Sequence, residues 1–414
     1  MDIRRLPLWE GRTASVLTNS LVHAVIEDQA GMVLEFSADN RIGGRLNAHS
    51  IPWFRGRGMS VYNDDNHMFW QDEQLLYHRA GAYFSFPNVG AACTVGDVRH
   101  PCDGATAHNY WMVERYGTDP IYGGIWLLSS QQSREAGNSW VVRKVDVLLP
   151  NHPVLYTGYS ITNTGTDILR AENAYQSLLG FPFLETGCIF NSVASHWYVS
   201  SRESRVPPVK KRLLGGALFG NLKQAPTPEG GTVDASIFPG LTGTEDFVSG
   251  IVPRDIPVTW ASAINPRQQM AYLMFAPGPQ RASDSLITAD YTHFGFLYGG
   301  DHATPQALYD GGSSFSAQVL CGMGTYYQDE GLAQALQQEN SDGISTTIGI
   351  EPGQTRTFMA GIALTAYDNP RMSGGFYSVE ALEDSFVMKR TKSTIIIPAD
   401  PSFAALSAIM ERVL

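Results

Sequence analysis

The sequence has 414 residues, of which 43% are hydrophobic and 17% charged, a composition typical of a globular protein with a large core. The formal net charge of -11 argues against a nucleic-acid surface, because phosphate binding needs clustered Lys and Arg. The 8 Trp, 18 Tyr and 19 Phe offer aromatic faces of the kind on which neutral sugars pack, so the composition permits a carbohydrate ligand.

The N-terminal segment and the cysteines bear on location and cofactors. Residues 1–17 contain no continuous apolar run of signal-peptide length, and no later stretch approaches the roughly 20 apolar residues that span a bilayer. We therefore expect a cytoplasmic protein with no membrane association. Cys93, Cys102, Cys188 and Cys321 are widely spaced without a Cys-x-x-Cys pair, so we expect reduced thiols and no zinc or redox motif.

Short apolar runs that end in Gly, Asn, Asp or Pro begin near the N-terminus and are typical of antiparallel strands with tight turns. Residues 16–28 lead through Gly31 into 32–36, and residues 140–149 lead through 150–153 into 154–162. Each pair of runs predicts a hairpin.

Residues 201–250 are rich in Pro and Gly and predict long loops, after which the strand pattern resumes. Helical periodicity is limited to 331–338, to 378–385 as a weaker candidate, and to 401–414, where Ser402 would cap the helix. No repeat is visible, which disfavours a propeller or solenoid. We predict an all-β fold, a large antiparallel β-sandwich with few short helices in a single domain over residues 1–414, whose free sheet edge would permit a homodimer.

Three segments in sequence order resemble the galactose mutarotase-like superfamily, most closely its hexose-phosphate mutarotase branch and bacterial relatives. Residues 81–90 are similar to the family's Gly-Gly-Ile-Pro-x-x-Phe-Pro-x-x-Gly strand and loop, and residues 103–111 match the Gly to Trp spacing of His-Gly-Phe-Ala-Arg-x-x-x-Trp. The hairpin at 159–165 and the strand at 175–187 resemble the third motif of the bacterial relatives. The resemblance covers about residues 15–190 and implies the mutarotase-like supersandwich.

In this superfamily a histidine and a glutamate act as general acid and base on the ring oxygen and the anomeric hydroxyl. Here Asp103 stands at one histidine position, Ala107 at the position of the phosphate-binding arginine, and Gln176 at the later histidine. Without the arginine, an unphosphorylated sugar is the better substrate. Gln176 would bind a hydroxyl but not transfer a proton, because an amide does not titrate near neutral pH.

Candidate catalytic residues follow from the second motif and from the resemblance. Asp103 and His108 would form an acid and base pair if the turn between them brings them together, although Asp-Gly is also an ordinary turn sequence. The resemblance implies a glutamate in the C-terminal half, for which Glu330 is our candidate. We expect the substrate-binding residues to be Asn88, Gln176, His67, Trp111 and His302.

Two of these histidines lie in segments that allow more than one interpretation. His67 belongs to residues 62–70, where oxygen ligands and aromatic side chains suit a sugar subsite, an oxygen-rich metal site, or a polar loop. His302 lies with His293 and Asp301 among aromatic residues that could line a cleft. We predict no obligatory cofactor, and a divalent metal stays open as an alternative.

These observations predict a carbohydrate-processing enzyme that resembles aldose 1-epimerases and acts on an unphosphorylated sugar or sugar derivative by general acid and base catalysis. One alternative is a carbohydrate lyase or epimerase that removes a carbon-bound proton, with or without a metal. The other is a non-catalytic sugar-binding protein, which the replaced histidines favour. The expected partner is a small-molecule carbohydrate, not nucleic acid or membrane.

Overall fold

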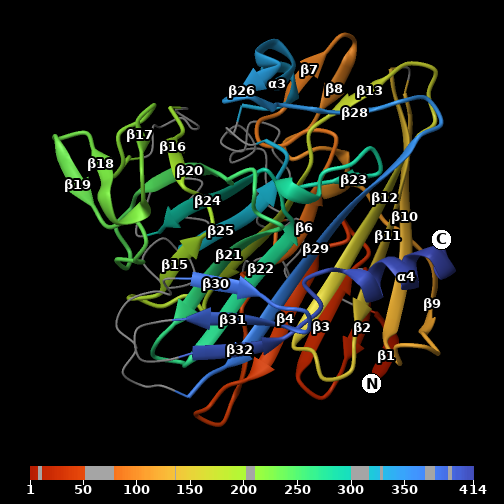
Figure 1. Ribbon diagram of the computed structural model, residues 1–414, viewed down its shortest axis with the longest axis horizontal. Helices are drawn as coiled ribbons and strands as arrows, with labels where there is room; N and C mark the ends of the chain where they lie inside the picture. Colours follow the sequence, from red (N-terminus) through yellow and green to blue (C-terminus); the bar gives the residue numbers. More distant parts are fainter. Residues whose placement is uncertain are drawn as a thin grey trace.

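Antiparallel strand pairing dominates the part of the chain that the structure describes (Figure 1). The computed structural model describes residues 1–7, 12–51, 79–135, 137–201, 210–299, 317–326, 330–368, 378–389 and 394–414. Within them the strands form two large sheets and several two- or three-stranded ribbons.

The first sheet runs through the N-terminal and central parts of the chain. Its strand order in the described residues is β1 (Asp2–Pro7), β2 (Thr13–Thr18), β3 (Val22–Glu27), β4 (Val33–Asp39), β6 (Ala82–Ser85), β14 (Ala174–Gly180), β25 (Ala317–Gly324), β24 (Tyr291–Tyr298), β20 (Glu245–Ile251), β16 (His196–Val199) and β17 (Leu218–Phe219). The short strand β5 (Arg45–Asn47) pairs with β4. Every pairing in this sheet is antiparallel.

The second sheet contains the predicted hairpin of residues 140–162, which is confirmed as the pair β11 and β12. Its strand order in the described residues is β15 (Ile189–Ser192), β21 (Val258–Asn265), β22 (Met270–Pro277), β29 (Thr355–Ala366), β12 (Val154–Asn163), β11 (Asn138–Leu148), β10 (Ile125–Glu135) and β9 (Met112–Thr118). A two-residue strand, β23 (Leu286–Ile287), joins β29 in parallel.

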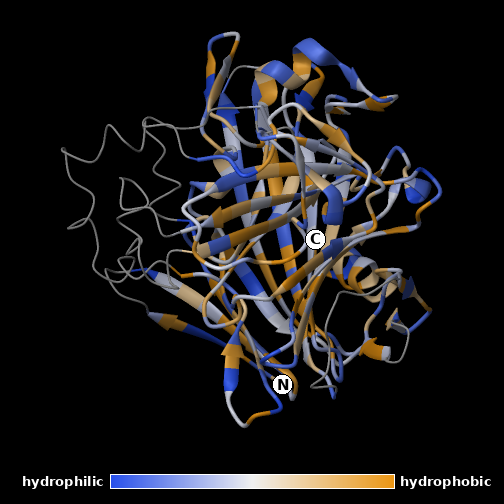
Figure 2. Cartoon of the chain, turned by 90° about the vertical axis from the view of Figure 1, so that its left-hand side faces the viewer, coloured by the Kyte–Doolittle hydropathy of each residue, from blue (hydrophilic) through white to orange (hydrophobic). Residues whose placement is uncertain are grey.

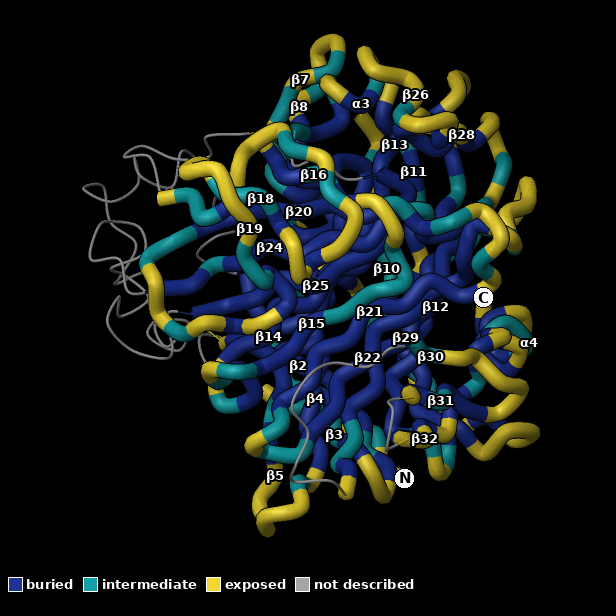
Figure 3. The backbone as a smooth tube through the Cα atoms, turned by 60° about the vertical axis from the view of Figure 1, so that its left-hand side comes forward, coloured by how far each residue is buried: buried dark blue, intermediate teal, exposed yellow. Residues whose placement is uncertain are grey.

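Aromatic side chains pack the two sheets face to face. The ring of Phe84 on β6 stacks on Tyr159 of β12 with centroids 3.9 Å apart, and it lies 5.9 Å from Phe358 of β29. Burial of these rings removes apolar surface from water and so stabilises the packing of the two sheets. Figure 2 shows many hydrophobic residues on the central strands, and Figure 3 shows that these strands are buried while exposed residues gather in loops. The predicted all-β sandwich is confirmed.

Polar side chains also connect elements inside the core. The Ser177 hydroxyl on β14 lies 2.6 Å from the Tyr272 hydroxyl on β22, and His49 Nε2 lies 3.1 Å from Ser177 Oγ. On β11, Lys144 Nζ lies 3.1 Å from Asp146 Oδ2. All five side chains are buried, and the contacts offset part of the free-energy cost of removing them from water.

The C-terminal residues cover the face of the second sheet that is turned away from the first. The ribbon β30 (Ser378–Ala381), β31 (Ser385–Lys389) and β32 (Thr394–Pro398) and the helix α4 (Ala404–Val413) contribute apolar side chains to one cluster with that sheet. Gly158 of β12 permits the close approach of α4, because a Cβ there would lie 2.1 Å from Met410 Sδ.

The remaining elements are short and lie outside the two large sheets. They are the hairpins β7 (Cys93–Val95) with β8 (Val98–His100), β18 (Ala225–Thr227) with β19 (Gly231–Val233), and β26 (Asn340–Ser341) with β27 (Ile344–Ser345), the pair β13 (Leu169–Ala171) with β28 (Ile348–Ile350), the helix α3 (Leu332–Gln338), and the 3-10 turns η3 (Ala105–Ala107), η4 (Leu222–Gln224) and η5 (Pro279–Arg281). Within residues 210–250, the described elements before β20 are only two to three residues long, as the predicted long loops imply.

The helix predictions have three outcomes. The helix at 331–338 is confirmed as α3. The helix at 378–385 is wrong, because Ser378–Ala381 pairs with β31 as a strand, and this tertiary pairing overrides the helix propensity of its residues. The C-terminal helix is confirmed, but its N-cap is Phe403, at a left-handed φ of 60°, and Ser402 Oγ instead accepts a 3.2 Å hydrogen bond from the Ala404 N–H.

The four cysteines are free thiols, with Cys188 and Cys321 buried and Cys93 and Cys102 half-buried. This agrees with the prediction of reduced cysteines. Among the described residues, no helix has the length and apolar character required to cross a membrane.

The buried ion pair on β11 provides a test of the interior. Asp146→Asn would leave the Lys144 ammonium buried without a counter-charge, so we expect the free energy of unfolding to fall by about 3–5 kcal/mol in urea titrations. The control is Asp39→Asn, whose partner Arg45 is exposed and 3.4 Å away, and it should cost less than about 1 kcal/mol. Equal losses in the two variants would contradict the account.

Candidate functional site

One pairing register crosses five neighbouring strands of the first sheet and aligns polar residues from distant parts of the sequence. Gln176 of β14 pairs with Tyr83 of β6 on one side and with Gly322 of β25 on the other. Gly322 in turn pairs with His293 of β24, and His293 with Ser249 of β20. We call these five residues the central row.

The central row lies on the face of the first sheet that is turned away from the second. Side chains alternate between the two faces of a strand, and the neighbours Phe84, Tyr175 and Phe294 belong to the core between the sheets. On the outer face, a separate apolar cluster borders the row and contains Leu178 and Phe247. This face of the sheet therefore combines buried polar side chains with a buried apolar cluster.

Gln176 is fully buried, and its amide is only half satisfied. Its Nε2 donates to Ser85 Oγ at 2.6 Å, whereas its Oε1 has no hydrogen-bond partner among the described residues. A buried acceptor without a donor costs about 1–3 kcal/mol. A ligand hydroxyl that donates to this oxygen would recover that free energy.

His293 is the second buried polar group at the centre of the row. Burial lowers its pKa to about 3, so the imidazole is neutral at neutral pH. A Cβ at position 322 would lie 2.0 Å from His293 Nε2. The ring therefore lies over Gly322, on the side of His293 that faces Gln176, and the glycine makes this position possible.

A second group of polar residues surrounds the loop at residues 87–91, next to the row. Asp103 Oδ1 accepts the Gly90 N–H at 2.9 Å, and its Oδ2 accepts the Tyr83 hydroxyl at 3.0 Å. Glu172 Oε2 accepts the Val89 N–H at 3.2 Å, and burial raises the pKa of this carboxyl well above its usual range. Through Tyr83, this loop is connected to the central row.

Asn88 and Glu330, two of the predicted site residues, lie at the same loop. Asn88 Nδ2 donates to Ala91 O and Pro101 O at 2.9 Å each, and its Oδ1 accepts the Leu332 N–H at 2.7 Å. These bonds tie α3 and the β7–β8 hairpin to the loop. Glu330 forms an isolated bridge with Gly90 through the backbone.

Asp103 and His108 are not joined by a hydrogen bond in the described structure. His108 Nε2 lies 2.7 Å from Cys102 O, and because a carbonyl only accepts, this nitrogen carries the proton. Burial lowers the pKa of His108, with smaller opposing effects of the Cys102 carbonyl and Asp103. Asp103 has a left-handed φ of 57°, the conformation that Asp readily adopts in turns.

The other predicted binding residues are not in the row. Trp111 is buried between the sheets, where its Nε1 donates to Thr106 O at 3.0 Å and its ring meets Tyr159 edge-on. His67 and His302 lie outside the described residues. Of the predicted residues, the structure thus places Gln176 in the row and Asn88, Asp103 and Glu330 around the adjoining loop.

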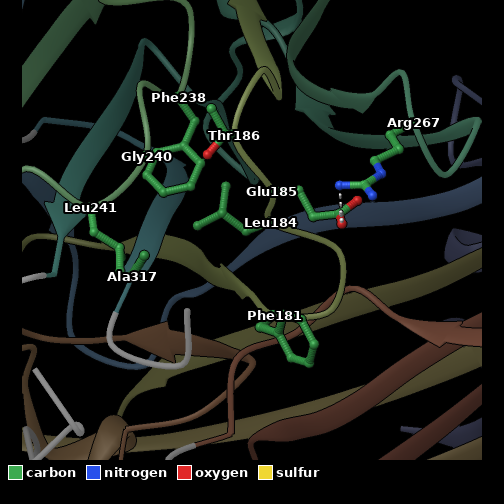
Figure 4. A pocket seen from close by; sticks show the side chains of 9 residues that line it. All are labelled: Phe181, Leu184, Glu185, Thr186, Phe238, Gly240, Leu241, Arg267 and Ala317. Atoms are coloured by element: carbon green, nitrogen blue, oxygen red, sulfur yellow. Dashed lines mark ion pairs between the residues drawn. The ribbon is translucent and has the colours of Figure 1, made fainter. Parts of the chain in front are cut away.

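Figure 4 shows a pocket of about 180 Å³, and no residue of the central row lines it. Phe181, Leu184 and Phe238 contribute apolar surface, and the Glu185 carboxylate lies 3.7 Å from Arg267. The same carboxylate already accepts hydrogen bonds from two neighbouring amide side chains. None of the predicted site residues lines this pocket, and we assign it no chemistry.

Metal ligation has no candidate within the described ranges. No group of three or more His, Cys, Asp and Glu side chains there is arranged to hold a metal ion. The alternative of a divalent metal stays a prediction.

Comparisons with known proteins give matches in structure but not in sequence. No protein-family model and no curated protein matches the chain. A galactose mutarotase-like protein from Clostridium acetobutylicum superposes with a TM-score of 0.57 at 12% identity, covering 89% of this chain and 99% of that one. The chain has the galactose mutarotase-like fold.

Two candidate aldose 1-epimerases share this fold. The protein from Klebsiella pneumoniae gives a TM-score of 0.58 at 13% identity, covering 87% of this chain and 83% of its own. The protein from Escherichia coli K12 gives a TM-score of 0.54 at 13% identity, and the superposition covers 86% of this chain and 100% of that one. At identities of 12–13%, the structural similarity between this chain and these proteins shows a shared fold and not a shared activity.

Sequence reasoning named His293 among residues that could line a cleft and missed Gly322 and Ser249. The available signal was the alternation of residues 291–298, which places His293 on the face opposite Phe294. Nothing local indicates that position 322 must be glycine, because the ring that needs the space comes from another strand of the mutarotase-like sheet.

Replacement of Gly322 tests the position of the imidazole. In Gly322→Ala the new methyl group would collide with His293, so we expect a loss of about 1–3 kcal/mol in unfolding free energy, measured in urea. Gly349→Ala is the control, because its Cβ would meet only Ile168 at 3.8 Å, and it should leave stability nearly unchanged. If Gly322→Ala had the same unfolding free energy as the wild type, the imidazole ring would not lie over the glycine.

The lowered pKa of His293 predicts a pH dependence. The folded pKa of about 3 lies below the value of about 6.5 in the unfolded chain, so the unfolded chain binds more protons between these values. The free energy of unfolding therefore decreases as the pH is lowered through this range. From about pH 7 to about pH 5, His293→Gln should lose about 2 kcal/mol less unfolding free energy than the wild type. An unchanged slope in His293→Gln would contradict the burial of the imidazole.

Proposed function

We propose that this protein binds an unphosphorylated sugar or sugar derivative at the central row and catalyses its anomeric interconversion in the manner of an aldose 1-epimerase. The observation that carries the proposal is the buried Gln176 Oε1, which lacks a donor among the described residues and lies in register with His293. A sugar supplies several hydroxyl donors, and one of them would satisfy this oxygen.

The chemistry of the row favours a neutral substrate. Its side chains are an amide, an imidazole, a phenol and an aliphatic hydroxyl, with no cation among them. The phosphate-binding arginine of the resembling family falls at Ala107, a buried residue in an apolar cluster with Tyr83. A phosphate there would lack a guanidinium partner, so a free sugar or a neutral derivative fits better.

We assign the proton transfer to His293. Ring opening removes the proton from the anomeric hydroxyl and adds a proton to the ring oxygen as the bond from the anomeric carbon to that oxygen breaks. The neutral imidazole accepts the first proton, and the imidazolium returns it to the ring oxygen. Rotation of the resulting aldehyde and reversal of these steps gives the other anomer, while Gln176 binds a hydroxyl throughout.

A non-catalytic sugar-binding protein is the second candidate. It is favoured by Gln176 and Gly322, since these two positions beside His293 carry no titratable side chain. Mutarotation ordinarily uses an acid and a base, and the lowered pKa of His293 makes its buried imidazole a weak base.

Saturation-transfer NMR against free aldoses, uronic acids and keto-sugars tests both candidates, with anomeric exchange recorded in the same samples. We expect one sugar to bind and to exchange faster, and His293→Gln to reduce that exchange at least about tenfold while binding persists. Gln176→Ala should weaken binding about tenfold, because a buried hydrogen bond is lost.

The exposed His196→Gln is the matched control and should change neither binding nor exchange. Binding without enhanced exchange would assign the protein to the non-catalytic class. Exchange that survives in His293→Gln would contradict the role of the imidazole, and binding unaffected by either row variant would contradict the site.

A further inference from the structure

A cavity of about 300 Å³ opens at a place distinct from the central row. Its walls come from β15 of the second sheet, from β16 of the first, and from the turn η4 that lies outside both. The volume is at the lower end of the range for small-molecule sites. The two sheets and the η4 turn therefore border an open space that is large enough for one small ligand.

The cavity has an aromatic wall. Trp197 is buried and stacks on Phe294 with ring centroids 5.8 Å apart, and Phe190 packs against the same ring at 5.8 Å. Ser192 Oγ lies 2.6 Å from Thr292 Oγ1, which ties β15 to β24 behind the cavity. This wall is thus held by contacts of the core and is formed before any ligand binds.

Several hydrogen-bond donors lie at the cavity. Trp197 Nε1, Asn221 Nδ2 and Lys223 Nζ make no hydrogen bond within the described part of the chain. Asn221 Oδ1, by contrast, already accepts the Lys223 N–H at 3.1 Å. The carboxylate of Asp234, two residues from Ser236 of the lining, is likewise engaged with the Ser236 N–H and hydroxyl. Three free donors call for a ligand that is rich in acceptors.

The local charge also favours an anion. The chain has 40 acidic and 29 basic residues, yet residues 210–236, which supply η4 and Ser236 to the lining, contain Lys210, Lys211, Arg212 and Lys223 against Glu229 and Asp234. The Arg212 guanidinium donates to Asp234 O at 2.7 Å, which places this cation near the Ser236 side of the cavity. One ammonium in the lining matches a single carboxylate better than a doubly charged phosphate.

We propose that this cavity is a second ligand site, for a monosaccharide that carries one carboxylate. The sugar ring packs against the Trp197 side, its hydroxyls accept from Trp197 Nε1 and Asn221 Nδ2, and its carboxylate pairs with Lys223. This site is independent of the central row and does not rest on the function proposed for it.

The test is an NMR titration with glucuronate, with glucose as the neutral counterpart. We expect glucuronate to bind the wild type, Lys223→Gln to raise its dissociation constant about tenfold, and Trp197→Phe, which keeps the aromatic ring but removes the donor, to raise it several-fold. Glucose should bind this site at least about tenfold more weakly. Lys211→Gln is the matched control, because it removes a charge from the same segment without altering the lining, and it should change the constant less than about threefold.

The variants at the two sites separate the two proposals. Gln176→Ala and His293→Gln should leave glucuronate binding unchanged, and Lys223→Gln should leave binding at the central row unchanged. Circular dichroism and thermal unfolding verify that Trp197→Phe is folded. Loss of glucuronate binding in Gln176→Ala, an unchanged constant in Lys223→Gln, or no binding at about 10 mM would overturn the second site.

Discussion

The register of the first sheet is the constraint on which the candidate site depends. Gln176 and His293 are separated by more than a hundred residues, and only the shared pairing with Gly322 aligns them. Because side chains alternate along a strand, a slip of one residue in β25 would turn Gly322 to the core and place a bulky neighbour beneath the imidazole. The same slip would move Met323 and Cys321 out of the core, so packing between the sheets and the geometry of the site are set together.

The core explains why that register is stable. Ser177, next to Gln176 on β14, contacts Tyr272 of the second sheet and His49, so the strand that carries Gln176 outward is held by polar contacts on its inner side. The loop at residues 87–91 holds the other end of the row, since Asp103 bonds both Gly90 and Tyr83. Asp103 thus touches the site through Tyr83, whereas sequence reasoning expected it to act with His108.

Much of the fold could be predicted from the sequence, because strands and hairpins leave local marks. The alternation on either side of residues 150–153 predicts the β11–β12 hairpin, and the motif segments led to a fold that the structural comparisons confirm. The candidate site was harder to predict from the sequence. Gln176 was identified because it replaces a family histidine, but the pairing of Gln176, Gly322 and His293 is a long-range property with no signature within one segment. Trp111 was expected to bind substrate, yet its side chain is buried in the core, because an aromatic residue in a sequence does not show which face it will occupy.

A crystal structure of the protein soaked with the neutral sugar that binds most tightly tests the central claim directly. The account predicts the sugar on the outer face of the first sheet, with one hydroxyl donating to Gln176 Oε1 at about 2.7–3.2 Å and the anomeric hydroxyl beside His293. A sugar bound elsewhere, with Gln176 Oε1 satisfied by a protein group, would contradict the assignment of the central row as the site.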